Sequence, residues 1–391
     1  MQTRNRCINN EEIHSLSLYI HVPFCVRKCN YCDFYSELAD RSAIDGYIDA
    51  LLVEWALMKE KYRLENTPVE TLYFGGGTPS ILSLGQWKKI IGKLIHGLHF
   101  TPHYEWSIEC NPDSFSPETA SLWQGEGVTR ISIGVQSLDD KKLRIMGRVH
   151  SAQQALKLLA NPLLSRFASI GADLMYGVPG QTLESLSMSL DKVLSAPWLR
   201  HLSAYELTIN QATDFGRRRQ SLPFPPEETA VAMTKMVLEK TRARGFERYE
   251  ISNFSLPGHH CRHNEAYWRH KPYIGLGPAA HSYLPPVRYS NVNSLTDYGK
   301  ALRAGMLPVG FSETIDAAAV SREMIFLELR TKVGINEIDF RSMTGNDFAS
   351  SVRMPLLQEF VRTAMMEHEP PYWRLTDTGM LFADAVARDL F

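Results

Sequence analysis

Three of the six cysteines in the chain lie within one short stretch, "PFCVRKCNYCDF", as Cys25, Cys29 and Cys32. Thiolates are soft ligands that suit zinc or an iron–sulfur cluster. A structural zinc site uses four ligands, often in two separated pairs, and the sequence holds no second C-x-x-C pair. His21 is a poor fourth ligand because it lies inside the strand that leads into the loop. The spacing favours a four-iron cluster with one iron open to a small molecule over unrelated buried thiols.

Polar residues and glycines follow several predicted strands at the points where those strands end. The triplet Gly75–Gly77 follows one strand, Glu109 ends the next, Gln136 follows another, and Asp173 lies within a fifth. The carboxyl ends of strands in a βα barrel meet at one mouth, so we expect a single site built from these segments. Taken singly, each has an ordinary interpretation: the glycines as a bare turn and the glutamate as a solvated side chain.

The elements that must position these residues alternate over the first ~300 residues as short apolar runs and longer helical patterns. Strands are predicted at 17–22, 71–76, 106–110, 130–135, 168–177 and 202–209, and helices at 43–62, 85–98 and 227–245. This alternation predicts an α/β fold made of parallel βα units. Periodicity alone leaves open whether they form a partly closed barrel or an open doubly wound sheet.

The pattern changes after Phe246, where His, Tyr, Gly and Pro become frequent. We predict four parts: an N-terminal tail (1–16), a βα core (17–245), a His/Tyr/Gly-rich segment that packs on the core (246–310), and a smaller, mainly helical C-terminal domain (311–391).

The overall composition is typical of a globular protein, with 44% hydrophobic and 22% charged residues and a net charge of −1. This balance predicts no attraction to nucleic acid or to acidic membranes. No apolar run is long enough to span a membrane, and the first residues lack the apolar region of a secretory signal. The cysteines are therefore expected in a reducing compartment, the cytoplasm. Cys7 and Cys110 have no assigned role.

The cysteine motif resembles that of the radical S-adenosylmethionine (SAM) superfamily. The resemblance implies a [4Fe–4S] cluster whose open iron binds SAM, and an electron from the cluster that cleaves SAM to a 5′-deoxyadenosyl radical. "YIHVPFCVRKCNYCDF", "GGGTPS", "GVQS", "DLMYGVPGQT" and "PGHHCRHNEAYW" are together similar to the oxygen-independent coproporphyrinogen III oxidase (HemN) family. The similarity covers nearly the whole chain. It implies an incomplete (β/α)6 TIM-type barrel with an added C-terminal domain.

Carried over residue by residue, the resemblance implies two sets of cofactor-binding residues. The cluster ligands match Cys25, Cys29 and Cys32. The SAM-contacting positions match Tyr19, Gly76, Gly77, Thr78, Glu109, Gln136, Arg148 and Asp173, and some of the last three line a second SAM site in the oxidases.

Two branches of the family differ at the position of Phe34. The oxidases carry a further cysteine there, whereas the HemW-like heme chaperone branch has the "CDF" found here and a His-Asn-x-x-Tyr-Trp motif. The resemblance to that branch implies heme binding by His263, Asn264, Tyr267 and Trp268, and transfer of heme to an acceptor protein. Histidine and cysteine are heme ligands and aromatic rings stack on porphyrin, so His259, His260 and Cys261 are further candidates.

Three functions therefore stay open at this point. The first is a heme chaperone with a radical SAM core that receives electrons from a small donor protein. The second is an oxidase that decarboxylates the propionates of coproporphyrinogen III, which the absence of the extra cysteine disfavours. The third is a radical SAM enzyme for another substrate, with the His-rich segment purely structural.

Overall fold

The computed structural model of the chain describes residues 15–391, so Cys7 and most of the predicted tail lie outside the described residues. The main sheet has twelve strands in the order β14-β13-β12-β11-β1-β4-β5-β6-β7-β8-β10-β9. Within the described chain β8 does not pair with β1, so the sheet is open, as expected for an incomplete barrel. All six predicted strands are present, in sequence order and parallel: β1 (Leu16–Val22), β4 (Pro68–Gly76), β5 (His99–Cys110), β6 (Arg130–Gln136), β7 (Ser169–Tyr176) and β8 (Leu199–Glu206).

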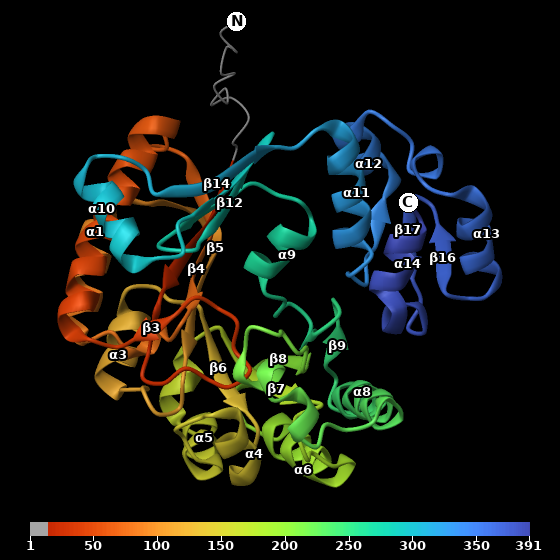
Figure 1. Cartoon of the computed structure of the whole chain (residues 1–391), viewed down its shortest axis with the longest axis horizontal. Coiled ribbons are helices and arrows are strands. Elements are labelled where there is room, and N and C mark those ends of the chain that lie inside the picture. Colours follow the sequence, from red (N-terminus) through yellow and green to blue (C-terminus); the bar gives the residue numbers. More distant parts are fainter. Residues whose placement is uncertain (1–14) are drawn as a thin grey trace, which may run out of the picture.

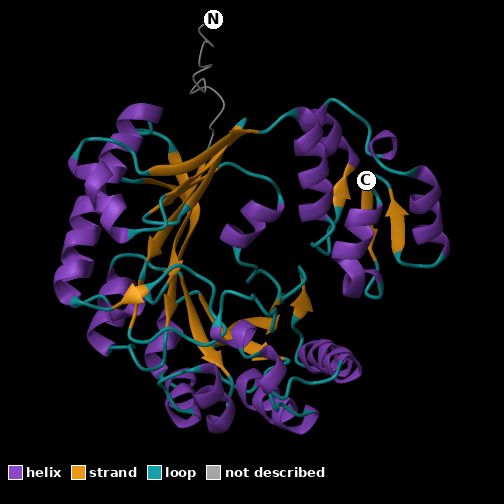
Figure 2. Cartoon of the chain, in the orientation of Figure 1, coloured by secondary structure: helices purple, strands orange, loops and turns teal. Residues whose placement is uncertain are grey.

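Helices cover the outer side of the parallel strands (Figure 1), and the orange strands of Figure 2 lie inside this layer. The three predicted helices become α1, α2 and α8, and α2 starts with a capping box in which Ser83 and Gln86 satisfy each other's backbone N–H groups. Apolar residues such as Leu18, Phe74 and Ile131 are fully buried in the core beneath. The covering helices are α1 (Arg41–Tyr62), α2 (Leu84–Lys93), α3 (Pro117–Gly125), α4 (Asp140–Met146), α5 (Ala152–Leu159), α6 (Leu183–Leu194) and α8 (Glu227–Ala243).

The segment 246–310 extends the sheet at both edges as well as packing on it. At one edge β11 (Tyr273–Leu276) adds to β1 in parallel, and β12 (His281–Leu284), β13 (Val287–Asn291) and β14 (Val309–Thr314) follow in antiparallel order. At the other edge lie β10 (Asn253–Ser255) and β9 (Glu247–Arg248). Helix α10 (Leu295–Arg303) packs against α1, while α9 (Arg262–Trp268) lies on the inner side of the sheet, between it and the C-terminal domain (Figure 1).

The C-terminal domain has its own core, which includes Met324, Phe340 and Leu375. It begins with α11 (Ala317–Glu328), slightly later than the predicted residue 311, because β14 belongs to the main sheet. A three-stranded sheet of β15 (Ile335–Asn336), β17 (Tyr372–Leu375) and β16 (Met366–Glu369) packs with α12 (Glu337–Thr344), α13 (Met354–Arg362) and α14 (Ala383–Asp389). Among the described residues, no helix combines the length and apolar character that a membrane span requires.

Candidate functional site

The cysteine loop lies at the carboxyl end of β1. Cys25 ends the short strand β2 (Phe24–Cys25), which pairs with β3 (Glu37–Leu38) where the loop returns. The tip is anchored from outside the loop: Asn30 N–H donates to the carbonyl of Met146 at 2.9 Å, and the Asn30 carbonyl accepts from Phe215 N–H at 2.9 Å. These long-range bonds hold the thiols at the mouth of the parallel strands.

A cavity of about 670 Å³ opens beneath this loop, and we call it the polar cavity. It brings together the predicted residues from five segments of the sequence, as expected for groups at the carboxyl ends of neighbouring strands. Tyr19 is the one predicted SAM residue that does not line it. The predicted residues that do are Cys25, Cys29, Cys32, Gly76, Gly77, Thr78, Glu109, Gln136, Arg148 and Asp173.

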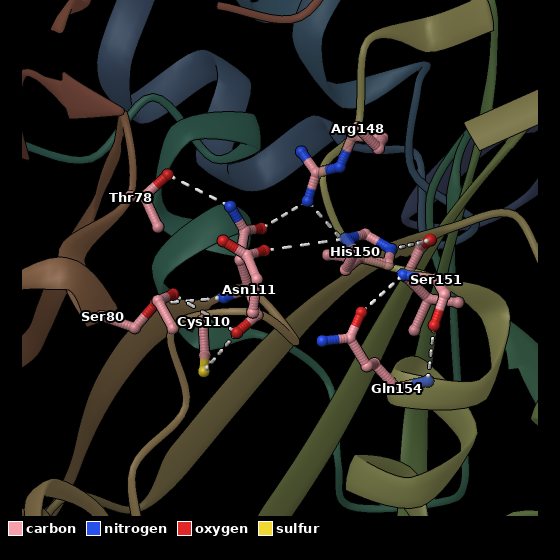
Figure 3. Close-up of polar contacts among 12 residues, drawn as sticks. Thr78, Ser80, Cys110, Asn111, Arg148, His150, Ser151 and Gln154 are labelled. Atoms are coloured by element: carbon pink, nitrogen blue, oxygen red, sulfur yellow. Dashed lines mark hydrogen bonds and ion pairs between the residues drawn. The ribbon is translucent and has the colours of Figure 1, made fainter. Parts of the chain in front are cut away.

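A hydrogen-bond chain links two of the thiols through Asn111, a residue that the sequence analysis missed. Arg148 Nη1 donates to Cys29 Sγ at 3.5 Å, and its Nη2 donates to Asn111 Oδ1 at 2.6 Å. The Asn111 amide donates to Thr78 Oγ1 at 3.1 Å (Figure 3), and that hydroxyl donates to Cys25 Sγ at 3.6 Å. Asn111 follows Glu109 by two residues in "ECNP", so its place at a strand end was the available signal.

The thiols suit a cationic group. Burial raises the pKa of Cys25, and it raises that of Cys32 to about 11, so both stay protonated without a nearby positive charge. Iron ions provide that charge and hold cysteine as thiolate. Among residues 15–391, no three His, Cys, Asp or Glu side chains converge closely enough for a single metal ion. Three soft thiol donors from one loop are a donor set that fits an iron–sulfur cluster.

Two buried carboxylates face the same cavity. Burial and the charge of Asp173 raise the pKa of Glu109 to about 7, although Tyr73 Oη and Gly76 N–H donate to it at 2.9 and 3.2 Å. Burial raises the pKa of Asp173 to about 6, although the hydrogen bond that Ser132 Oγ donates at 3.1 Å acts to lower it. Because positive charge lowers the pKa of a nearby carboxylate, both groups favour a cationic ligand such as an amino group or a sulfonium.

The glycine triplet is needed for close packing as well as for access. Gly76 has φ +101°, in the left-handed region, and a Cβ there would meet the His21 ring at 2.3 Å. A Cβ on Gly77 would lie 2.6 Å from the carbonyl oxygens of Val22 and Phe24. Gln136 also has a positive φ of 62°, which is rare for a residue with a side chain and is found more often at functional sites.

A second cavity of about 950 Å³ also borders the cysteine loop, and we call it the aromatic cavity. It shares only Asp33 and Phe34 with the polar cavity. Phe34 is 62% exposed although it is a large apolar side chain. Tyr19 lies here, where its ring stacks on Tyr73 at 6.1 Å. The other aromatic residues that line this cavity are Tyr35, Tyr267, Tyr273, Phe311 and the histidines His21 and His281.

The His-Asn-x-x-Tyr-Trp motif forms α9, and its residues point in different directions. His263 is 1% exposed, and its Nδ1 and Nε2 pair with Thr71 Oγ1 at 2.7 Å and with Tyr267 Oη at 2.8 Å. Tyr267 lines the aromatic cavity, and Asn264 is half-buried. Trp268 lines a separate cleft of about 320 Å³ beside the C-terminal domain, together with His260.

A buried ion pair fixes α9 on the sheet. Glu105 and Arg130, from β5 and β6, bond at 3.1 Å with side chains 8% and 5% exposed. The Glu105 carboxylate also accepts from the backbone N–H groups of Arg262 and His263, the first residues of the helix. Cys261 is buried beside it, and burial raises the pKa of its thiol. The first part of the His-rich segment is thus tied down by polar groups of the core.

The comparisons with known proteins agree with this architecture. The sequence model of the Radical SAM superfamily matches residues 19–193, and that of the HemN C-terminal domain matches residues 315–382. The solved structure of coproporphyrinogen III oxidase (HemN) from Escherichia coli shares the fold, with a TM-score of 0.84 over 96% of this chain and 90% of that chain at 20% identity.

Curated relatives match over nearly their whole length. The heme chaperone HemW of Bacillus subtilis is 31% identical over 95% of this chain and 97% of its own. The heme chaperone HemW of Escherichia coli is 32% identical over 95% of this chain and 97% of its own. Because identity above 30% extends over both chains, the cysteine loop, the polar cavity and the C-terminal domain are those of a radical SAM protein, and the chain belongs to the HemW family.

Proposed function

We propose that the protein is a heme chaperone that keeps a [4Fe–4S] cluster and SAM in the polar cavity, binds heme, and passes it to an acceptor protein. The names of the relatives support this function. The observation that carries it within the molecule is the aromatic cavity next to the cysteine loop. Aromatic rings provide large, flat apolar surfaces of the kind that a porphyrin covers.

In this proposal Cys25, Cys29 and Cys32 hold the cluster, which supplies the electron for SAM cleavage when it is bound. Thr78 and Arg148 donate hydrogen bonds to the thiolates. The SAM molecule lies against the backbone of Gly76 and Gly77, with Glu109, Gln136 and Asp173 around it. Tyr19 acts on this site through Tyr73, which donates to Glu109.

The motif on α9 contributes to heme binding through Tyr267, which lines the aromatic cavity. His263 stays a predicted axial ligand, but ligation would have to replace its bonds to Thr71 and Tyr267. Asn264 and Trp268 extend the same segment, with Trp268 facing the cleft at the C-terminal domain. A small donor protein would supply the electrons. The protein would work in the cytoplasm, a reducing compartment that suits the five free cysteines of residues 15–391.

The alternative is a coproporphyrinogen III oxidase, which the shared fold with HemN favours. Phe34 argues against it because a phenyl ring provides neither a thiol redox group nor a hydrogen donor. The test is an anaerobic assay of the cluster-loaded protein with coproporphyrinogen III, SAM and a reductant, beside a heme titration. Stoichiometric heme binding without turnover is expected. Turnover to protoporphyrinogen IX without heme binding would replace the proposed function by the oxidase.

A further inference from the structure

His281 is an exposed histidine on the wall of the aromatic cavity, at the start of β12. Its imidazole has no hydrogen-bond partner among the described residues, in contrast to most histidines around it. A histidine without a partner, on the wall of a cavity, keeps a ring nitrogen free to bind a metal ion.

The neighbouring histidines are engaged elsewhere. In His21, Nδ1 pairs with Tyr19 Oη at 3.1 Å and Nε2 with the Tyr35 carbonyl at 2.9 Å. Both nitrogens of His263 are also paired, and the ring is buried. His260 pairs through Nδ1 with Glu265 at 3.1 Å and lines the separate cleft. Among the described residues, His281 is therefore the histidine of the aromatic cavity whose ring nitrogens are not engaged in a hydrogen bond.

Exposed aromatic rings line the same cavity as this histidine. Phe34 and Phe311 are 62% and 54% exposed, so apolar surface that a ligand could cover faces water. Phe311 comes from β14 and Phe34 from the cysteine loop, and both line the cavity with Tyr267 and Tyr273. The volume of about 950 Å³ is at the upper end of the range for small-molecule sites, as a porphyrin requires.

The charged groups of the aromatic cavity fit a ligand whose carboxylates stay in the solvent. Arg288 beside His281 is already paired with Glu313 and Glu323, at 2.7 and 3.0 Å. Asp33 and Asp297 lie on the wall and would repel carboxylates. A bound porphyrin would thus point its apolar edge inward and its propionates outward.

We propose that the aromatic cavity binds heme, with His281 as an axial ligand and Phe34, Phe311 and Tyr267 against the macrocycle. This inference rests on the proposed function and specifies its site. It differs from the assignment of His263, and the two make separable predictions. Since Phe34 lines both cavities, the bound heme would lie next to the cysteine loop.

The test is a heme titration of the full, cluster-loaded chain, followed by the position and intensity of the Soret band. His281→Ala should weaken binding by roughly tenfold or more and shift the band, as expected for loss of a metal contact. Added imidazole should restore the band of the wild type, which a merely structural role would not explain. His99→Ala is the matched control because His99 is exposed at the start of β5, away from the three cavities.

Phe311→Ser provides a second, independent variant, since an exposed side chain contributes little to folding. It should weaken heme binding several-fold without shifting the Soret band. An unchanged band and affinity in His281→Ala, with a wild type that binds heme, would overturn this inference and leave the proposed function intact. A band lost in His260→Ala instead would move the site to the cleft and also overturn it. A wild type that binds no heme would contradict the proposed function itself.

Discussion

The polar cavity and the aromatic cavity share Asp33 and Phe34, yet the side chains around them differ in kind. The polar cavity has thiols, the buried carboxylates of Glu109 and Asp173, and the Arg148 guanidinium, linked by hydrogen bonds at the ends of β4, β5, β6 and β7. The aromatic cavity has tyrosines, phenylalanines and an imidazole without a hydrogen-bond partner within residues 15–391, and these come mainly from β1, β11, β12, β14 and α9. Buried charges suit a small, charged cofactor, whereas open aromatic walls suit a flat apolar ligand.

This difference teaches that one loop can border two cavities whose side chains differ in kind and that have only Asp33 and Phe34 in common. The thiols of the cysteine loop face the polar cavity, while Phe34, at the end of the same motif, lines both. If the separation holds, a change confined to one cavity should leave binding at the other intact.

The largest effect is expected for Cys29→Ala. Removal of one of three thiolates should abolish the broad thiolate-to-iron absorption after anaerobic reconstitution, together with the EPR change that SAM causes in the reduced cluster. Heme stoichiometry should stay that of the wild type, because Cys29 does not line the aromatic cavity.

Cys261→Ser is the control for Cys29→Ala, since Cys261 is buried beside Glu105 outside the polar cavity; it should keep the cluster. A Cys29→Ala protein that reconstitutes normally, or a native zinc ion, would contradict the cluster assignment. Parallel loss of heme would show that the two cavities are not independent.

Glu105→Ala should lower the free energy of unfolding by about 3–5 kcal/mol, because it leaves the buried Arg130 without its counter-ion and the first N–H groups of α9 unpaired. Urea denaturation measures the change. Since α9 carries Tyr267, heme binding should weaken while the cluster is retained. The control Glu126→Ala breaks an exposed pair with His96 and should change stability by about 0–1 kcal/mol. Equal losses in the two variants would contradict the anchoring role.

Raising the pH should lower the stability of the cofactor-free protein, because Glu109 lies buried in the polar cavity. The folded-state pKa of Glu109 is about 7 against an ordinary value of 4.5, so the protonated form is favoured by folding. The stabilisation that protonated Glu109 contributes, on the order of 3 kcal/mol, is complete below pH 4.5 and is lost as the pH rises through about 7. The unfolding midpoint of Glu109→Gln should depend less on pH over this interval. An identical pH dependence in both proteins would contradict the assignment of the shift to Glu109.

Lowering the pH should release heme from the aromatic cavity. Neutral imidazole is the ligating form, and burial together with Arg288 lowers the pKa of His281 below 6.5. The affinity for heme should reach its full value above this pKa and should fall about tenfold for each pH unit below it. Arg288 and Asp297 remain charged over most of this interval, because ion pairs raise the pKa of Arg288 and hydrogen bonds from Ser294 and Lys300 lower the pKa of Asp297.

The pH midpoint also separates the two candidate axial ligands. Burial lowers the pKa of His263 to about 4, so heme held by His263 would persist to more acidic conditions. A heme-release midpoint near 4, measured from the Soret band, would favour His263 over His281.

The smallest effect is expected for Phe34→Ala. Loss of one exposed aromatic contact should weaken heme by about 1 kcal/mol, or about fivefold, while the cluster absorption stays unchanged. Val149→Ala is a suitable control, because Val149 is 50% exposed and lines only the polar cavity. Heme affinity that is unchanged in Phe34→Ala would limit the heme site to the part of the cavity away from the loop.

Much of the polar cavity was predictable from sequence because its residues are defined by local position. Each of the six predicted strands is present, and chemistry-bearing residues at their carboxyl ends meet because parallel strands end at one edge. Asn111 was missed since an asparagine after a strand has no distinctive signal of its own. Periodicity also could not show that β11 would pair with β1 and bring 246–310 into the main sheet.

The sequence alone thus determined the parallel βα core, the cysteine cradle and the family, because apolar runs and motif spacing are local properties. Only the tertiary structure decided which histidine is buried and which is exposed. His263 and His281 lie eighteen residues apart in one His-rich region. Glu105 and Thr71 hold His263 inside the core, while β12 leaves His281 on an open wall. The availability of a side chain depends on what packs over it, and those partners come from distant parts of the chain.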